Sequence, residues 1–252
     1  MDRLSFRGRE ALAASLLAAA LAAWIVSVDR MRGMDAGPGT DLGALGWYVG
    51  IWVTMMAAMM LPSAAPTVVL FSRSRGGAQT WVFVGGYLVA WTAYGLAAYG
   101  VYRGIRAAAP SFLAWDERGP WVAGAALAAA GLYQLTPLKR ACLRHCRSPL
   151  HFLLHARPGW RGAARMGVEH GGFCIGCCTG LMLALFALGV MSLFWMAVVA
   201  GAILVEKALP RGEAFARLLA LVLVAAGIWV AAAPASVPGL TQPSPMRMQM
   251  QP

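Results

Sequence analysis

Residues 45–71 read LGWYVGIWVTMMAAMMLPSAAPTVVLF and contain no charged side chain. A helix needs roughly 20 mostly apolar residues to cross the hydrocarbon of a bilayer, because every backbone polar group must then be satisfied within the segment. This stretch is longer than that, so it can cross at a tilt, and Pro62 with Pro66 predicts a kink that neighbouring helices absorb. The stretch therefore indicates a transmembrane helix.

Further apolar segments lie on both sides of this stretch. Of the 252 residues, 60% are hydrophobic and only 12% are charged, which is too much apolar surface for a water-soluble domain to hide. The sequence predicts an all-α fold, a polytopic transmembrane bundle of about seven helices (six to seven). The predicted segments are Ala11–Val28, Leu45–Phe71, Thr80–Tyr102, Pro120–Leu138, Gly172–Met191, Ser192–Ala208 and Ala214–Ala233. The fifth and sixth leave room only for a tight turn, so we expect a helical hairpin.

Lys and Arg are distributed unevenly between the two sides of this bundle. Basic residues accumulate in short cytoplasmic loops, and most of the 21 Lys and Arg fall on the side of the N-terminus. The asymmetry predicts a multi-pass protein of the inner cell membrane with a cytoplasmic N-terminus. We expect one transmembrane domain over residues 1–233 and a flexible, Met-rich tail over residues 234–252. Nucleic acid is not an expected partner, because the basic residues are split among loops.

Five cysteines occur in two tight groups. Cys142 and Cys146 follow the fourth predicted helix, and Cys174, Cys177 and Cys178 lie at the start of the fifth. In the predicted topology both groups are on the cytoplasmic side, where thiols stay reduced, so free thiols are favoured over disulfides. The groups flank one loop, and neighbouring fourth and fifth helices would bring the sulfur atoms together.

Basic residues at positions 139, 140, 144 and 147 surround the first cysteine pair and are expected to lower its thiol pKa. Thiolate ligands suit Cu(I), Zn(II) or iron–sulfur clusters. His145 lies inside the first pair and His170 precedes the second group by one helical turn, so both are potential ligands. Packing of buried thiols is the alternative, and for five clustered thiols we favour metal binding. His151 and His155 are instead expected to snorkel from an interfacial helix.

Methionine sulfur atoms extend this pattern into the predicted membrane. Met55 with Met59 and Met56 with Met60 form two overlapping pairs, each one helical turn apart, near the middle of the second segment. Thioether sulfur is a soft, uncharged ligand that prefers Cu(I). Met182 continues the line of the second cysteine group by another turn. The alternative is that these methionines fill gaps between helices.

Ionisable residues are almost absent from the predicted membrane segments. Glu206 and Lys207, at the cytoplasmic end of the sixth segment, are expected to pair or snorkel rather than to relay protons. No Ser/His/Asp set or HExxH helix can be assembled at membrane depth, which argues against a hydrolase. An enzymatic role is therefore less expected than metal handling.

Three motifs together resemble a known family. They are Trp52-x-x-Met55-Met56-x-x-Met59-Met60-x-Pro62, then Tyr133-Gln134-x-x-Pro137-x-Lys139-x-x-Cys142-Leu143-x-x-Cys146-Arg147-x-Pro149, then His170-Gly171-x-x-Cys174-x-Gly176-Cys177-Cys178 with Glu206-Lys207 further on. Their joint spacing, over about residues 45 to 210, is similar to that of a bacterial family of predicted metal-binding integral membrane proteins. The resemblance implies a membrane protein that binds metal through these Cys and Met positions. It supplies no reaction.

The sequence thus predicts a metal-binding integral membrane protein that handles Cu(I), by transport or by delivery to a membrane enzyme. Copper is the expected metal and zinc the alternative. Expected partners are the lipid bilayer, the metal ion, and a copper-dependent membrane enzyme or a metallochaperone.

Two other functions stay open. A thiol-redox membrane protein would use Cys142 and Cys146 against Cys177 and Cys178, although two vicinal cysteines make a poor disulfide with each other. A structural or accessory subunit would carry zinc, or no metal, between the fourth and fifth helices.

Overall fold

The computed structural model describes residues 6–32, 41–74, 77–108, 115, 117–148, 158–209, 212–238 and 240. Within these residues the chain forms eight α-helices and one short 3-10 helix, and no strand. They are α1 (Phe6–Met31), α2 (Leu45–Ser74), α3 (Gly77–Ala108), α4 (Gly119–Gln134), α5 (Pro137–Arg147), α7 (Gly159–Leu188), α8 (Leu193–Ala208), α9 (Gly212–Ala232) and η2 (Pro234–Ser236). The predicted all-α fold is confirmed.

Five of these helices, α1, α2, α3, α7 and α9, are long and apolar enough to cross a membrane. Helices α4 and α8 have 16 residues each. At 1.5 Å per residue each is about 24 Å long, which is less than the roughly 30 Å of hydrocarbon in a bilayer. The fourth and sixth predicted segments are therefore shorter in the structure than a full span.

The fourth predicted segment, Pro120 to Leu138, is divided between two helices. Helix α4 ends at Gln134, and α5 begins at Pro137. The Thr136 side chain caps α5 by accepting a hydrogen bond from the backbone N–H of Lys139 at 3.2 Å. Proline disfavours helix for the residue before it and suits the first helical turn, so Pro137 separates the two helices. The prediction of one continuous helix is wrong here.

The connection between the fourth and fifth predicted segments, for which no helix was predicted between Lys139 and Glu169, is largely helical in its described residues. Its beginning belongs to α5, so the first cysteine pair lies on a helix, and its end belongs to α7, which begins at Gly159 rather than at Gly172. The polar residues at the start of α7 had placed this part outside the predicted span. The apolar patch Leu150–Leu154, with His151 and His155, lies outside the described residues, as do residues 241–252 of the tail.

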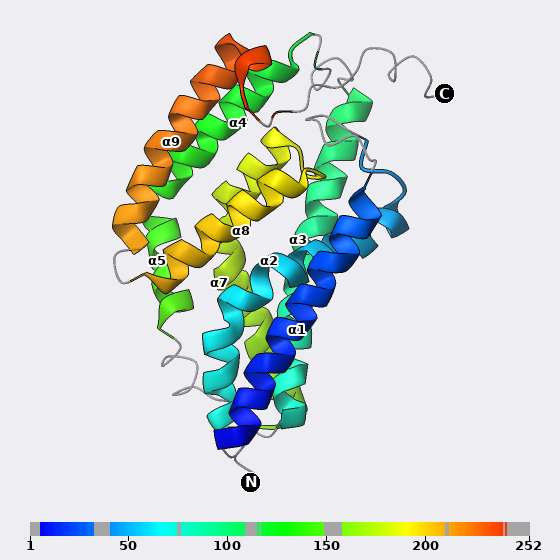
Figure 1. Ribbon diagram of the computed structural model, residues 1–252, viewed down its shortest axis with the longest axis vertical. Coiled ribbons are helices and arrows are strands. Elements are labelled where there is room, and N and C mark those ends of the chain that lie inside the picture. The colour runs from blue at the N-terminus through cyan, green and yellow to red at the C-terminus, as the bar shows by residue number, and fades with distance from the viewer. Residues whose placement is uncertain are drawn as a thin grey trace.

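The hairpin predicted between the fifth and sixth segments is confirmed. Helix α7 ends at Leu188, and Gly189 has φ of +111°, a backbone conformation that favours glycine. The Ser192 N–H donates to the Gly189 carbonyl at 3.0 Å, and the Ser192 side chain accepts from the backbone N–H of Trp195 at 3.4 Å. This turn sends α8 back along the bundle toward α5 (Figure 1).

The helices form a bundle in which α7 and α8 lie between two outer groups. Figure 1 shows α4 and α9 side by side on one edge and α1, α2 and α3 on the other. Backbones approach closely where glycine stands: a Cβ at Gly124 would lie 2.5 Å from the Gly227 carbonyl oxygen of α9, and one at Gly167 would lie 2.1 Å from the Phe83 carbonyl oxygen of α3. Such close packing fixes α7 against α3 and positions the cysteines that α7 carries.

Candidate metal centre

Three cysteine thiols meet inside the bundle. Cys174, Cys177 and Cys178 of α7 are buried, and their Sγ atoms all lie within 4.8 Å of one another. Their spacing places them on one face of the helix, because residues three and four apart are neighbours on a helical surface. The arrangement can present several sulfur ligands to one soft metal ion.

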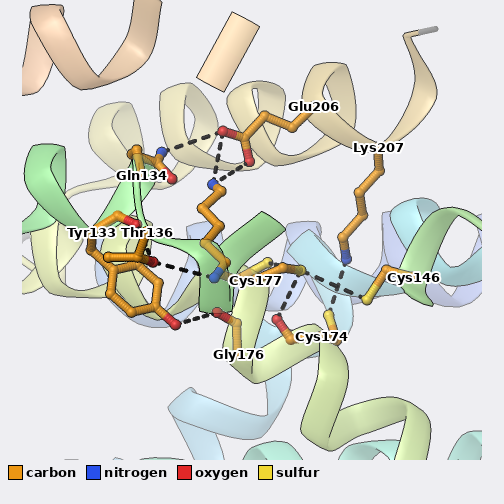
Figure 2. Close-up of polar contacts among 11 residues, drawn as sticks. Tyr133, Gln134, Thr136, Cys146, Cys174, Gly176, Cys177, Glu206 and Lys207 are labelled. Carbon is orange, nitrogen blue, oxygen red and sulfur yellow. Dashed lines mark hydrogen bonds and ion pairs between the residues drawn. The ribbon is translucent and has the colours of Figure 1, made fainter. Parts of the chain in front are cut away.

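Cys146 of α5 joins these three thiols. Its Sγ lies 3.7 Å from the Sγ of Cys177 (Figure 2). The Cys177 Sγ in turn lies 3.5 Å from the Sγ of Cys178. We call Cys146, Cys174, Cys177 and Cys178 the thiol cluster. The prediction that the two cysteine groups converge is confirmed for these four residues.

Cys142 lies at the edge of the thiol cluster. Its side chain is half-buried, and it packs against Gly176 of α7: a Cβ added at Gly176 would come 2.6 Å from the Cys142 Sγ. The absence of a side chain at Gly176 therefore leaves room for the Cys142 sulfur against α7. Tyr133 at the end of α4 donates a hydrogen bond to the Gly176 carbonyl, which closes the same contact (Figure 2).

The basic residues of α5 do not act on the cysteines as predicted. Arg140 and Arg144 are exposed, and Arg147 donates a hydrogen bond to the carbonyl of Leu209. Burial raises the pKa of the Cys142 thiol. A hydrogen bond with Cys174 is the main cause that raises the pKa of the Cys146 thiol. The prediction that neighbouring arginines lower the pKa of this pair is wrong, because their side chains point to solvent or to carbonyl groups.

Lys207 of α8 brings a cation to the thiol cluster. Its Nζ donates hydrogen bonds to the Cys174 Sγ at 3.0 Å and to the Ser63 Oγ of α2 at 3.2 Å. The Oη of Tyr87 in α3 lies 3.1 Å from the same sulfur. Figure 2 shows the lysine side chain directed at Cys174. An ammonium group at this distance favours the thiolate, which is the form that binds metal.

A buried ion pair lies beside the thiol cluster. The Nζ of Lys139 in α5 lies 2.7 Å from the Glu206 Oε2, and the two side chains are only 1% and 2% exposed. Gln134 donates a hydrogen bond to the Glu206 Oε1 at 3.3 Å. Glu206 and Lys207 are consecutive, so the end of α8 holds α5 with one side chain and Cys174 with the next (Figure 2).

The contact of Lys207 with Cys174 was not predicted. Both residues were expected to pair or to snorkel: Glu206 does form an ion pair, with Lys139, whereas the Lys207 side chain is directed into the site. No local pattern in the sequence indicated this contact, because Cys174 and Lys207 are 33 positions apart on different helices.

The methionines of α2 are fully inside the bundle. Met55, Met56, Met59 and Met60 are between 0% and 2% exposed. This burial fits both the predicted ligand role and the alternative, in which the methionines fill gaps between helices. Their role as metal ligands stays a prediction.

Two contacts place the α2 methionines relative to the thiol cluster. The ring of Trp52 lies 5.8 Å from that of Phe186 in α7, and Ser63 shares the Lys207 ammonium with Cys174. Between these contacts α2 carries the four methionines, while α7 carries Cys178 and the fully buried Met182. The two helices run in opposite directions here, and each rises about 17 Å between the two contacts. The thioethers of α2 and the thiols of α7 therefore lie within the same part of the bundle.

The two histidines predicted as ligands pack against aromatic rings. His170 of α7 is 2% exposed, and its ring centre lies 5.8 Å from that of Phe83 and 5.7 Å from that of Tyr87. His145 of α5 stacks on Phe173 at 4.5 Å, and its Nδ1 lies 2.9 Å from a backbone carbonyl of its own helix. Their role as ligands also stays a prediction.

Fold and site together define an all-helical protein with membrane-length helices that encloses a buried group of thiols suited to a soft metal ion. The chain belongs to the PpoB2 copper chaperone family, whose family model matches residues 49–230. The matched region contains all four residues of the thiol cluster and the four methionines of α2. Helix α1 precedes it. No curated protein and no solved structure matches the chain significantly. The predicted membership of a metal-binding family, with a copper-related role, is confirmed.

Proposed function

We propose that this protein is a membrane-embedded Cu(I) chaperone that accepts the ion on methionine thioethers, holds it on the thiol cluster and delivers it to a copper-dependent membrane enzyme or a metallochaperone. The observation that carries the proposal is the meeting of four buried thiols from α5 and α7 in a chain of the copper chaperone family. Thiolate sulfur is soft and selects Cu(I) over hard cations.

The charges around the thiol cluster support a monovalent ion. Cu(I) bound by two thiolates carries one net negative charge, which is costly in a dry interior unless it is compensated. The Lys207 ammonium, 3.0 Å from the Cys174 sulfur, supplies that compensation. The neighbouring Lys139–Glu206 pair is neutral as a unit and leaves this balance unchanged.

The order of the sulfur ligands along the bundle supports a direction of Cu(I) movement. Thioethers bind Cu(I) without losing a proton, whereas a thiol must be deprotonated, so an ion enters a methionine site more readily than a thiolate site. The four methionines of α2 lie on the stretch that ends at Ser63, next to Lys207 and Cys174. In our proposal Cu(I) passes from these methionines to the thiol cluster and leaves on the side where α5 lies.

Membrane insertion is supported by the outer surface of the bundle. Five helices are long and apolar enough to cross a bilayer, and large apolar side chains such as Leu21, Trp121 and Leu221 are more than 60% exposed. Exposed apolar surface of this extent is stable in lipid and unfavourable in water. The uneven distribution of basic residues supports a cytoplasmic N-terminus and, with it, a position of α5 near the cytoplasm.

Copper content of the purified protein tests the proposal. The full chain is isolated in detergent after growth with copper, and metal is measured by elemental analysis for wild type and for Cys177→Ser with Cys178→Ser. We expect copper in the wild type and its loss in the double variant. Cys142→Ser is the matched control, because it removes a thiol at the edge of the cluster and is expected to retain most of the copper. Equal, near-zero copper in all three proteins would reject the proposal, and zinc in its place would favour a structural metal site.

One observation favours a second candidate function. The Cys146 and Cys177 sulfur atoms, 3.7 Å apart, need only a small movement to reach the roughly 2.05 Å of a disulfide bond. In a thiol-redox protein an external disulfide would oxidise this pair and leave as two thiols, and an external dithiol would later reduce the Cys146–Cys177 disulfide and leave as a disulfide. Alkylation of trapped thiols separates the two functions. A copper chaperone shows protection of thiols only when copper is loaded, whereas a redox protein shows a disulfide that appears and disappears with the oxidant.

A further inference from the structure

A cavity of about 300 Å³ lies between the end of α1 and the beginning of α2. Ser27 and Arg30 of α1 face Gly46, Trp47 and Gly50 of α2 across it. The α2 residues of the cavity, from Gly46 to Thr54, precede Ser63, which contacts Lys207, by 9 to 17 residues. At 1.5 Å per residue the cavity lies about 14 to 26 Å along the helix from that contact, so it is separate from the thiol cluster.

The cavity has a positive lining. Arg30 is exposed, and its Cζ lies 5.6 Å from the ring centre of Trp47, a cation–π contact. Among the described residues that line the cavity, no side chain is acidic. A guanidinium group stacked on an aromatic ring keeps its N–H donors available for planar oxyanions such as phosphate. The charge of the lining therefore points to an anionic ligand.

The hydroxyl of Ser27 is the second feature. Ser27 is 2% exposed, and among the described residues its Oγ has no hydrogen-bond partner. Thr54, which lines the same cavity, donates its hydroxyl to the Gly50 carbonyl of its own helix at 2.8 Å. A buried hydroxyl without a partner is unfavourable, so Ser27 has a donor to offer to a ligand oxygen.

Two glycines leave space for the ligand. A Cβ at Gly46 or at Gly50 would meet no atom within 4 Å, although both residues line the cavity. The opening is thus kept by the absence of side chains on one wall of α2. A larger residue at either position would fill the cavity without colliding with the bundle.

We propose that this cavity binds the phosphate group of an anionic phospholipid headgroup, with the Arg30 guanidinium and the Ser27 hydroxyl donating to its oxygens. The inference rests on the membrane insertion that the proposed function includes. Arg and Trp near the ends of membrane helices lie at the level of the headgroups, where a guanidinium group can donate hydrogen bonds to a lipid phosphate. Ser27, Arg30, Gly46 and Trp47 all precede residue 49, where the family match begins, so the site belongs mainly to the part of the chain outside it.

Lipid retention tests the inference. The full chain is purified in mild detergent, exchanged into an equal mixture of phosphatidylglycerol and phosphatidylcholine, and its bound lipid is measured by native mass spectrometry. We expect wild type to retain phosphatidylglycerol preferentially. Arg30→Gln should reduce this retention about fivefold or more, since one basic residue near a lipid surface contributes roughly that factor. Gly50→Leu, which fills the cavity, and Ser27→Ala should also reduce it.

Arg32→Gln is the matched control. Arg32 follows α1, is exposed and does not line the cavity. The Arg32→Gln variant therefore removes the same charge as Arg30→Gln and is expected to retain as much lipid as wild type. Equal retention in wild type, Arg30→Gln and Gly50→Leu would overturn the inference.

A soluble anion is the other source of a phosphate group. We expect phosphatidylglycerol to raise the melting temperature of the wild-type protein and inorganic phosphate to have little effect. If inorganic phosphate gives the same rise and displaces the lipid, the site binds a free anion and the lipid assignment is overturned. Copper content is measured in the same samples. Unchanged lipid retention in a protein without copper would reject the proposed function and leave this inference standing.

Discussion

The ammonium group of Lys207 contacts the sulfur of Cys174 and the hydroxyl of Ser63 at the same time. Because a cation beside a thiolate favours the metal-binding form, Lys207→Gln is expected to weaken Cu(I) binding about tenfold, the factor of roughly one charged hydrogen bond. Competition with a chromophoric Cu(I) chelator at fixed pH measures this change.

A conservative variant separates charge from packing at the same position. Lys207→Arg keeps the cation and reaches a similar distance, so it should bind Cu(I) more tightly than Lys207→Gln does. If both variants bind as wild type does, the lysine has no electrostatic role at the cluster.

The buried ion pair of Lys139 and Glu206 is expected to contribute to stability. Glu206→Gln leaves a buried ammonium without a counter-charge, which typically costs about 3–5 kcal/mol. We expect the free energy of unfolding in detergent to fall by that order. Lys139→Met combined with Glu206→Gln removes both charges and should restore much of the loss. A single variant as stable as wild type would show that water reaches the pair.

Among the helices, α7 depends on close contact with α3. Gly167→Ala would place a methyl group 2.1 Å from the Phe83 carbonyl oxygen, so the two helices must separate. Overpacking of this kind costs about 1–3 kcal/mol. Gly172→Ala on the same helix meets no atom within 4 Å and should stabilise by up to roughly 1 kcal/mol through helix propensity. Thermal unfolding of the two variants measures the difference. Equal melting temperatures would show that α3 and α7 are not in close contact.

Local sequence patterns predicted the elements well where hydropathy alone defines them, as in α2 and α9. They failed where helix and apolar segment do not coincide. Pro137 interrupts an apolar run and divides α4 from α5, while the start of α7 carries Arg161, Arg165 and Glu169 and so lacks a membrane-like composition. A helix can extend beyond the lipid, because its hydrogen bonds are internal. Apolar length therefore gives a minimum extent for α7.

The candidate site was predictable to the extent that it is local. Cys174, Cys177 and Cys178 share a face because of their spacing, and this spacing is visible in the sequence. The contacts of Cys174 with Tyr87 and with Lys207 join residues 87 and 33 positions apart. Nothing in a periodic pattern fixes such contacts, since they follow from how whole helices pack.

For the whole molecule, the position of each loop relative to the membrane is the main prediction. A reporter inserted between α2 and α3 should be cytoplasmic, and one inserted between α3 and α4 should be on the other side, because basic residues accumulate on the cytoplasmic side. Fluorescent and phosphatase reporters distinguish the two compartments. The reverse pattern would contradict the proposed orientation, and recovery of the protein in the soluble fraction would contradict insertion.

The last turn of α8 has a mechanical consequence. Glu206 and Lys207 are joined by one peptide bond, yet one holds α5 and the other holds Cys174. A rotation of this turn that withdraws the ammonium from the sulfur also pulls on Lys139, and through it on the helix that carries Cys146. In the proposed function, Cu(I) binding at Cys174 would therefore change the position of α5, and with it the position of Cys146, so binding and release of the ion would depend on the same turn of α8.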